Sequence, residues 1–538
     1  MNVRVAVRLG AYYDSVVLMQ LQRALTALPG VLDAGVVMAT PANREILAAS
    51  GLTPDEDIEA GPHDLLIAVK AESEEGAGEA LARVDSLLQV RRGGTDQEFR
   101  PRSLASALKL LPEARWVLIS VPGRYAAGVA EEALDHGRNV FLYSDNVSVE
   151  QEAALKHKAR EKGLLVLGPD CGTAIVGGTG LGFANRVRKG SIGLIGASGT
   201  GLQAVTSHLH QLGAGISQAI GTGGRDLSAE AGGITALQAM DLLGRDPETR
   251  VIVLISKPPA PEVAARLLSA ARATGKPVVV DFLGHVPPVR RLGSIRFAAS
   301  LAETAELAAG LLDEEKKEED GAAGGRRGFL RGLFAGGTLA YETRLALQTF
   351  LPAEGNTILD LGDDEFTVGR LHPMIDQDLR LRRLRQEAAD PEVSTILLDV
   401  VLGDGAHADP AGELAPVIER AIAGRDGDLD VIAIVLGTDE DPQNLAEQIA
   451  TLTRAGARVC RTVSEAVEAV WQRQAGEESR GMPVPLETVQ APLAAVNVGL
   501  ESFCDSLLAQ GARAVQVEWK PPAGGNEKLA AILSRLKG

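Results

Sequence analysis

The sequence predicts an α/β protein of several domains, and three observations support this fold class. The chain has 538 residues, which is too many for a single hydrophobic core. Short apolar runs alternate with amphipathic stretches of helical length, as in parallel sheets covered by helices on both faces. One block of this kind also occurs twice, about 140 residues apart. We expect a ferredoxin/ACT-like α+β domain, a Rossmann-like domain and two flavodoxin-like domains.

Residues 1–98 form the expected α+β domain. The apolar runs VRVAVRL, VLDAGVVMA and HDLLIAVKA are the predicted strands. The predicted helices are YYDSVVLMQLQRALTAL, after the first strand, and EEGAGEALARVDSLL, after the last. This order is typical of a small domain of the ferredoxin or ACT type.

The pattern changes to strand, helix, strand over residues 99–188. ARWVLISVP, RNVFLYS and GLLVLGPD are the predicted strands, and helices are expected from Tyr125 and Val149. Continuous apolar strands between amphipathic helices predict a parallel, Rossmann-like sheet.

An internal repeat covers residues 189–312 and 329–478. GLIGASGTGLQAV in the first copy corresponds to GLFAGGTLAYETRLAL in the second, and GRDPETRVIVLISKP corresponds to AADPEVSTILLDVVLGD. Each copy has a glycine-rich turn between strand and helix, so two doubly wound domains are expected, with their turns on a shared cleft. The charged and glycine-rich residues 313–328 between them predict a linker.

The tail, residues 479–538, predicts one βα unit that ends in PPAGG. One such unit cannot form a core alone. We therefore expect it to dock on another domain or subunit.

Charge and cysteine content exclude several function classes. The chain has 54 lysines and arginines against 71 aspartates and glutamates, a net charge of −17, which disfavours nucleic acid or an anionic membrane as partner. The apolar runs are too short to span a bilayer, and no leader pattern opens the sequence, so we expect a cytoplasmic protein. Cys171, Cys460 and Cys504 show no C-x-x-C spacing, so neither a disulfide framework nor a metal site is expected.

Three glycine-rich turns are candidates for binding a phosphate or another anion. They contain Ser198, Gly199 and Thr200; Gly223, Gly224 and Arg225; and Gly336, Gly337 and Thr338. Glycines let the backbone approach a ligand, and amides at a helix N-terminus bind oxyanions. The first turn matches neither the P-loop nor the full dinucleotide pattern, so it predicts an anion without a nucleotide. Plain helix capping by Ser198 and Thr200 is the alternative, and Arg225 is a candidate for a two-pronged clamp.

No catalytic group is identified by its spacing. His285, His372 and Asp376 are candidates, with a packed or capping role as the alternative for each. Two acidic clusters follow predicted strands: Asp363 to Glu365, and Asp399 with Asp404, His407 and Asp409. Their spacing matches no standard metal site. Cys171 is expected to pack under a turn.

Several motifs resemble the α subunit of succinyl-CoA synthetase. They are LGPDCGTAI, SIGLIGASGTGLQAV, IGTGGRDLS, DPETRVIVLIS and TGKPVVVDFLG. With ATPANREIL, YSDNVSVE, LHPMID and NVGLESF, the whole chain is identified as a member of the FdrA family. The resemblance implies that the Rossmann-like domain is of the CoA-binding type and that the two flavodoxin-like domains are of the ligase type.

The resemblance implies two functions. FdrA proteins are linked to the carbamoyltransferase of allantoin catabolism, where an FdrA-type subunit acts with partner subunits on oxamate and carbamoyl phosphate. The alternatives are an acyl-CoA synthetase, for which CoA would be a substrate, and a non-catalytic scaffold subunit. In the synthetases a phosphorylated histidine stands where PVRRLGSIRFAAS has Ser294. A serine hydroxyl cannot replace that imidazole in phosphoryl relay, so the sequence favours the carbamoyltransferase.

Overall fold

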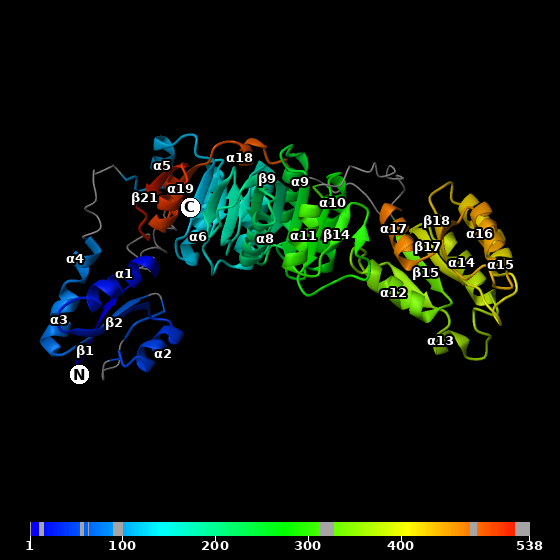
Figure 1. Ribbon diagram of the computed structural model, residues 1–538, viewed down its shortest axis with the longest axis horizontal. Helices are drawn as coiled ribbons and strands as arrows, with labels where there is room; N and C mark the ends of the chain where they lie inside the picture. Colours follow the sequence, from blue (N-terminus) through cyan, green and yellow to red (C-terminus); the bar gives the residue numbers. More distant parts are fainter. Residues whose placement is uncertain are drawn as a thin grey trace, which may run out of the picture.

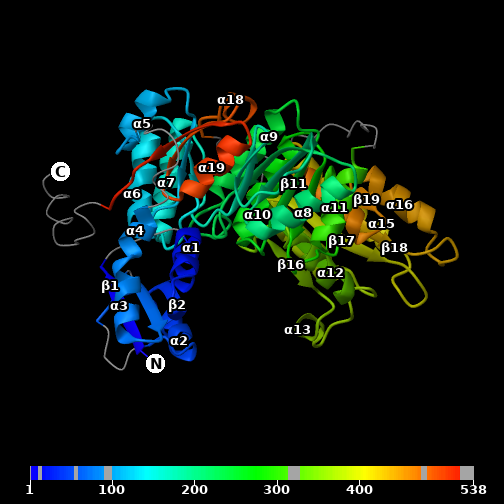
Figure 2. The same ribbon diagram turned by 60° about the vertical axis from the view of Figure 1, so that its left-hand side comes forward.

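The computed structural model describes residues 2–9, 15–53, 59–62, 64–89, 100–312, 328–473 and 481–521. These residues form four sheets with helices on them, and the four units lie in a row (Figure 1). The unit with β1 (Asn2–Arg8) stands at one end and the unit with β15 (Phe329–Phe334) at the other, an order that the turned view preserves (Figure 2). The predicted α/β fold class is confirmed. Most of the expected linker lies outside the described residues.

The first unit is a three-stranded antiparallel sheet in the order β1-β3-β2. Strand β3 (Leu65–Ala71) pairs on both edges, which explains why its side chains from Leu65 to Val69 are all buried. Thr40 caps α2 by accepting a hydrogen bond from the Asn43 amide at 3.3 Å. The other elements are β2 (Val31–Met38), α1 (Ser15–Thr26), α2 (Pro41–Ala49), α3 (Glu74–Ala82) and α4 (Val84–Gln89).

The second unit joins two parts of the chain that are far apart in the sequence. Its parallel sheet has the order β21-β20-β4-β5-β6, in which β20 (Ala494–Val498) of the tail pairs with β4 (Trp116–Ile119). The tail therefore completes this sheet, and Figure 1 shows it lying beside α5 and α6. The remaining elements are α5 (Leu104–Leu110), α6 (Gly123–Asp135), β5 (Asn139–Leu142), α7 (Val149–Lys162), β6 (Val166–Leu167), α18 (Glu487–Gln490), α19 (Glu501–Ala509) and β21 (Arg513–Val517).

The third unit has eight strands in the order β13-β14-β12-β11-β9-β10-β7-β8. The hairpin of β7 (Thr173–Val176) and β8 (Thr179–Gly182) precedes residue 189 in the chain but pairs with β10 of this sheet. The parallel strands are β9 (Lys189–Gly196), β10 (Ile216–Gly221), β11 (Val251–Ser256), β12 (Val278–Phe282) and β14 (Ile295–Phe297), with β13 (Arg291–Leu292) antiparallel at the edge. The helices are α8 (Gly199–Gln211), α9 (Ile234–Arg245), α10 (Pro261–Ala273) and α11 (Leu301–Gly310).

The fourth unit repeats the parallel part of the third. Its order is β16-β15-β17-β18-β19, and the third unit has the same order in β10-β9-β11-β12-β14. The predicted internal repeat is thus confirmed as two flavodoxin-like sheets. The elements after β15 are α12 (Gly337–Leu347), β16 (Thr357–Asp360), α13 (Asp364–Thr367), α14 (Asp378–Ala389), β17 (Val393–Val401), α15 (Pro410–Ala423), β18 (Asp430–Leu436), α16 (Leu445–Arg454), β19 (Arg458–Cys460) and α17 (Val463–Arg473).

The third and fourth units meet at α17. The Arg272 guanidinium donates to the Trp471 carbonyl at 2.6 Å, and the Gly293 amide donates to the Glu468 carboxylate at 2.8 Å. Neither contact involves the turns at Ser198 or Gly336, and their placement on one cleft stays a prediction. Among the helices that the structure describes, none is both long and apolar enough to cross a membrane.

Candidate functional site

Three glycine-rich segments meet at the carboxyl end of β9 and β10. They are the turn after β9, the turn after β10 and the segment that contains Pro169 and Thr173. The Thr222 amide donates to the Gly196 carbonyl at 2.9 Å, which ties the turn after β10 to the turn after β9. A β-carbon on Gly221 would lie 2.2 Å from the Thr173 carbonyl oxygen, and one on Gly223 would lie 2.4 Å from the Pro169 carbonyl oxygen. Glycine is therefore required at both positions for packing. Ligands of doubly wound sheets bind at the carboxyl edge of the strands, and in this sheet the strand order reverses beside β9, between β9 and β11.

The N-terminus of α8 lies at this point. Ser198 caps the helix, because its hydroxyl accepts a hydrogen bond from the Gly201 amide at 3.1 Å. A β-carbon on Gly196 would lie 2.5 Å from the Leu202 side chain, and one on Gly201 would lie 2.8 Å from the Ser198 hydroxyl. At Gly199 the nearest atom would be 3.6 Å away. The protein thus needs two of these glycines for its own packing, whereas a β-carbon at Gly199 would make an ordinary van der Waals contact, so packing does not require a glycine there.

A buried hydroxyl lies beside the N-terminus of α8. The Thr173 hydroxyl is the atom 3.6 Å from the β-carbon position of Gly199, and it has no hydrogen-bond partner although the residue is buried. The hydroxyl of Thr222, in the neighbouring turn, is also buried without a partner. Leaving a buried hydroxyl unpaired costs about 1–3 kcal/mol. A ligand that accepts hydrogen bonds in front of α8 would recover that energy at Thr173, and the helix N-terminus favours an oxyanion there.

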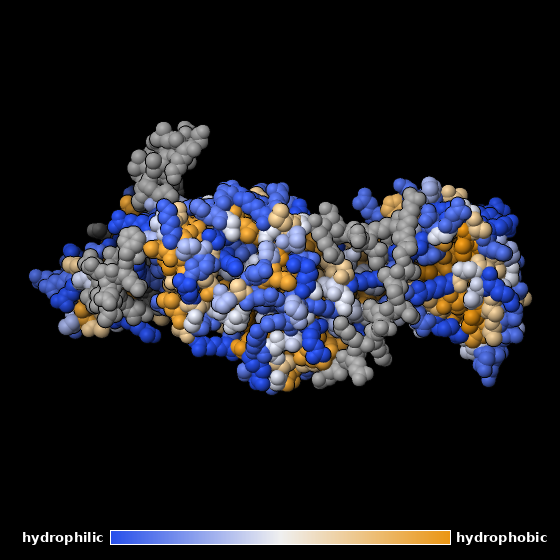
Figure 3. All heavy atoms as spheres, turned by 90° about the horizontal axis from the view of Figure 1, so that it is seen from above, coloured by the Kyte–Doolittle hydropathy of each residue, from blue (hydrophilic) through white to orange (hydrophobic). Residues whose placement is uncertain are grey.

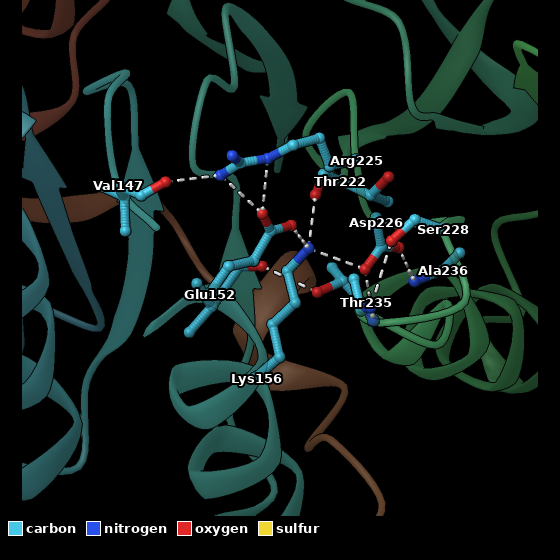
Figure 4. A network of polar contacts seen from close by, with 11 residues as sticks. Val147, Glu152, Lys156, Thr222, Arg225, Asp226, Ser228, Thr235 and Ala236 are labelled. Carbon is cyan, nitrogen blue, oxygen red and sulfur yellow. Dashed lines mark hydrogen bonds and ion pairs between the residues drawn. The ribbon is translucent and has the colours of Figure 1, made fainter. Parts of the chain in front are cut away.

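Arg225 has a different partner from the one we expected. Its guanidinium donates to the Glu152 carboxylate at 3.1 Å and to the Val147 carbonyl at 2.8 Å (Figure 4). The predicted clamp therefore holds a carboxylate of the protein itself, on α7. Gly224 has no atom within 4 Å of its β-carbon position, so packing does not explain a glycine there.

A buried charge network extends from this pair (Figure 4). The Lys156 ammonium donates to Glu152 at 2.7 Å, to Asp226 at 2.7 Å and to the Thr222 carbonyl at 3.1 Å. Asp226 also accepts from the Ala236 amide at 2.9 Å, at the start of α9. The side chains of Lys156, Glu152 and Asp226 are fully buried. With Arg225 the network holds two cations and two carboxylates, so its charge is balanced, and it joins α7 to the turn after β10.

Sequence reasoning missed Glu152, Lys156 and Asp226. Glu152 and Lys156 are four residues apart in a helix that is rich in charged residues, which is the usual pattern of a solvated face. The sequence feature that pointed to this charge network was Asp226, because it directly follows Arg225 in the glycine-rich turn.

In the fourth unit a carboxylate of the protein occupies the corresponding turn. Asp399, at the switch point of this sheet, accepts from the amides of Ala335 and Gly336, both at 2.8 Å. Gly336 is therefore satisfied internally and does not need the expected ligand. A β-carbon on Gly337 would lie 2.4 Å from the Asp360 carboxylate. Thr338 is exposed, and anion binding at Gly337 and Thr338 stays a prediction.

The remaining candidates have mainly local roles. His372 accepts from the Met374 amide through Nδ1 at 3.2 Å, and Asp376 accepts from the Asp378 amide at 2.9 Å, as capping side chains do. His285 is exposed in a turn after β12. Ser294 lies in the β13–β14 turn, where its carbonyl accepts from the Val278 amide at 3.1 Å. The structure does not bring these side chains together with the N-terminus of α8.

The acidic clusters also serve the fold. Asp363 caps α13 and Asp409 caps α15, accepting from the amides of Glu365 at 3.1 Å and Gly412 at 2.9 Å. His407 lies 3.3 Å from Glu413. In the described ranges, no three histidine, cysteine or acidic side chains are grouped closely enough to hold a metal ion.

The cysteines provide a test of burial. All three are buried, and desolvation raises the pKa of the Cys171 thiol to about 12 and that of Cys460 and Cys504 to about 11. Because the unfolded thiols have a pKa of about 8.5, we expect no rapid labelling by a thiol reagent at pH 8 in the native protein and three labelled cysteines in denaturant. Mass spectrometry counts the labels, and rapid native labelling of Cys171 would contradict its expected packing role.

Three known domain families match separate parts of the chain. An AllF heavy metal-associated domain matches residues 1–101, a CoA-binding domain matches 187–284, and a CoA-ligase matches 333–472. Heavy-metal sites favour cysteine thiolates, and the first 101 residues contain no cysteine. The residues present there do not fit such a metal.

The chain is 42% identical over 493 residues to the uncharacterized protein YahF of Escherichia coli K12, covering 85% of this chain and 95% of that protein. It is 30% identical over 183 residues to subunit alpha 1 of the ADP-forming succinate–CoA ligase of Archaeoglobus fulgidus, which covers 33% of this chain and 60% of that subunit. A solved dinucleotide-forming acetyl-coenzyme A synthetase of Ca. Korarchaeum cryptofilum is 18% identical, with a TM-score of 0.31, over 66% of this chain and 82% of that one.

Proposed function

We propose a function from one premise: this chain belongs to the family of YahF, the FdrA-type proteins that resemble the α subunit of succinyl-CoA synthetase. In our proposal it is a CoA-ligase-like subunit that binds the phosphoryl group of an acyl phosphate in front of α8. The CoA-binding and CoA-ligase matches support a thiol of CoA as the acceptor. They favour this reading over the carbamoyltransferase that the sequence led us to expect.

The observation that carries the proposal is the unpaired Thr173 hydroxyl beside Gly199, at the N-terminus of α8. Attack of a thiolate on the carbonyl carbon of an acyl phosphate forms a thioester and releases phosphate. The leaving phosphate gains negative charge, which the N-terminus of α8 and the Thr173 hydroxyl would stabilise. This half-reaction needs no phosphorylated histidine, so it is compatible with Ser294.

Ser294 also supports a second candidate function. Carbamoyl phosphate is a mixed anhydride of the same class, and its transfer to the nitrogen of oxamate or a similar small amide releases the same phosphate group. That reaction requires no phosphoryl relay either. The two candidates differ in the acceptor, which is a thiol in the first and a nitrogen in the second.

We further propose that the chain works with partner subunits in the cytoplasm. Large hydrophobic side chains are exposed on α12 and in the segment after α13, and exposed apolar surface of this kind is typical of protein interfaces. They are Tyr341, Leu345, Val368, Leu371 and Ile375. Figure 3 shows hydrophobic residues reaching the surface between hydrophilic ones on the face seen there, including the end formed by the fourth unit.

Thr173→Val tests the proposal. It removes the hydroxyl at nearly constant volume, so we expect about tenfold weaker binding of acetyl phosphate, because a hydrogen bond to a charged group contributes about 1.5–3 kcal/mol. Gly199→Leu should abolish binding, because its bulky side chain would block the approach of a ligand to the N-terminus of α8. Isothermal titration calorimetry of the chain with its native partners measures both, and assays with CoA and with oxamate decide between the acceptors.

Thr395→Val is the matched control. Thr395 is also buried with an unpaired hydroxyl, but it lies in β17 of the fourth unit. Its valine variant should bind acetyl phosphate like the parent. Equal binding by Thr173→Val, Gly199→Leu and the parent would show that the turn only caps α8, and the proposed site would be wrong.

A further inference from the structure

A pocket lies at the edge of the third sheet opposite the N-terminus of α8. It has a volume of about 250 Å³, and Lys189 and Ile216, which begin β9 and β10, line it. The N-terminus of α8 lies at the other end of β9. We propose that this pocket binds a small organic phosphate. The inference goes beyond the proposed function, because it uses none of the residues in front of α8.

The pocket is positively charged in an acidic protein. Arg186, Arg188 and Lys189 line it, and none of the lining residues that the structure describes is acidic. Lys189 forms an ion pair with Glu248 at 3.0 Å. In the described part of the chain, the guanidinium groups of Arg186 and Arg188 form no ion pair, although the net charge is −17. These three basic residues are exposed, and like charges that line one pocket repel each other, so a bound anion would reduce that repulsion.

The walls of the pocket are held by hydrogen bonds. Gln510, which directly follows α19, accepts from the Gly180 amide at 2.8 Å and donates to the Gly180 carbonyl at 3.0 Å, which fixes the β7–β8 hairpin against the tail. The Arg188 amide donates to Nδ1 of His210 at 3.1 Å, and the Arg188 carbonyl accepts from the Ile216 amide at 3.0 Å. The backbone that carries the arginines is therefore positioned before a ligand arrives, which reduces the entropy cost of binding.

The chemistry of the lining defines the ligand class. Arginine binds phosphate with two parallel hydrogen bonds, and two arginines are available. The buried side chains of Ile175 and Ile216 and the partly buried Val187 offer an apolar surface beside them. The volume of about 250 Å³ is more than an inorganic phosphate needs. A phosphate ester with a small apolar body fits these properties.

Phenyl phosphate is a suitable probe, with inorganic phosphate and phenol as its two halves. We expect the full chain to bind phenyl phosphate with a Kd of about 1 mM or tighter, to bind phosphate more weakly and not to bind phenol. The double variant Arg186→Gln/Arg188→Gln should lower the affinity at least about tenfold. Its matched control is Arg382→Gln/Arg420→Gln, which removes the same charge from exposed positions of α14 and α15.

Isothermal titration calorimetry gives the affinities, and modification by phenylglyoxal locates the site. Bound phenyl phosphate should protect Arg186 and Arg188 from the reagent. Equal affinity in the double variant and its control would overturn the inference, as would the absence of binding heat. Loss of binding in Thr173→Val with full binding in the double variant would place the probe in front of α8, which would overturn the pocket and support the proposed function.

Discussion

Replacing Lys156 with methionine is expected to destabilise the contact between the second and third units by about 3–5 kcal/mol, the usual cost of removing one partner from a buried ion pair. The variant leaves the carboxylates of Glu152 and Asp226 fully buried with only Arg225 to balance them. Because a chain of several units does not unfold in one step, hydrogen exchange of the α7 and α9 amides in urea is the appropriate measurement.

Lys158→Met provides the control on the same helix. Lys158 lies at the surface, where its ammonium pairs with Glu131 and Asp135 at 3.0 and 2.9 Å. Surface pairs of this kind contribute little, so this variant should exchange like the parent. If the two methionine variants show the same protection of α7 and α9, the network does not join the units.

Replacing Arg380 with methionine should have an effect of similar size in the fourth unit, about 3–5 kcal/mol. Arg380 is buried and donates to the Asp399 carboxylate at 3.0 Å and to the Leu333 carbonyl at 3.2 Å. Burial lowers the pKa of Arg380, and the charge of Asp399 opposes that shift. Without the guanidinium, Asp399 keeps its two backbone donors but loses its cation, so β15 and β17 should lose amide protection.

Arg382→Met tests whether charge alone matters. Arg382 lies two residues further along α14, is exposed and pairs with Asp378 at 2.9 Å. Hydrogen exchange of β15 and β17 should be unchanged in this variant. Full protection of both strands in Arg380→Met would mean that Ala335 and Gly336 satisfy Asp399 without the cation.

The fold could be predicted where neighbouring residues in the sequence form a repeating pattern. The alternation of apolar runs and amphipathic stretches identified both flavodoxin-like sheets, because their central strands β11, β12, β17 and β18 are almost entirely buried and the long helices between the strands bury one side. The repeat of the turns at Ser198 and Gly336 then related the two units. The hairpin of β7 and β8 was harder to place, since a short antiparallel pair gives no periodic signal that says which sheet it joins.

The site could be predicted only in part, for a physical reason. Glycine at 196, 199 and 201 indicates a tight turn, but the sequence does not distinguish a glycine that packs against Leu202 from one that packing does not require. Likewise, an arginine in a glycine-rich turn suggests an anion without saying whether that anion comes from solvent or from the protein. Here Glu152 supplies it, from a helix in another unit.

The pairing of β20 with β4 bears on how the protein is made. The ribosome releases β4 early, yet its neighbour in the sheet emerges only after the whole of the third and fourth units has been synthesised. During that interval β4, with its buried side chains from Trp116 to Ile119, presents an open edge to the cell. Nascent chains are thus exposed to edge-to-edge association, and a chain truncated before residue 494 keeps this edge open permanently.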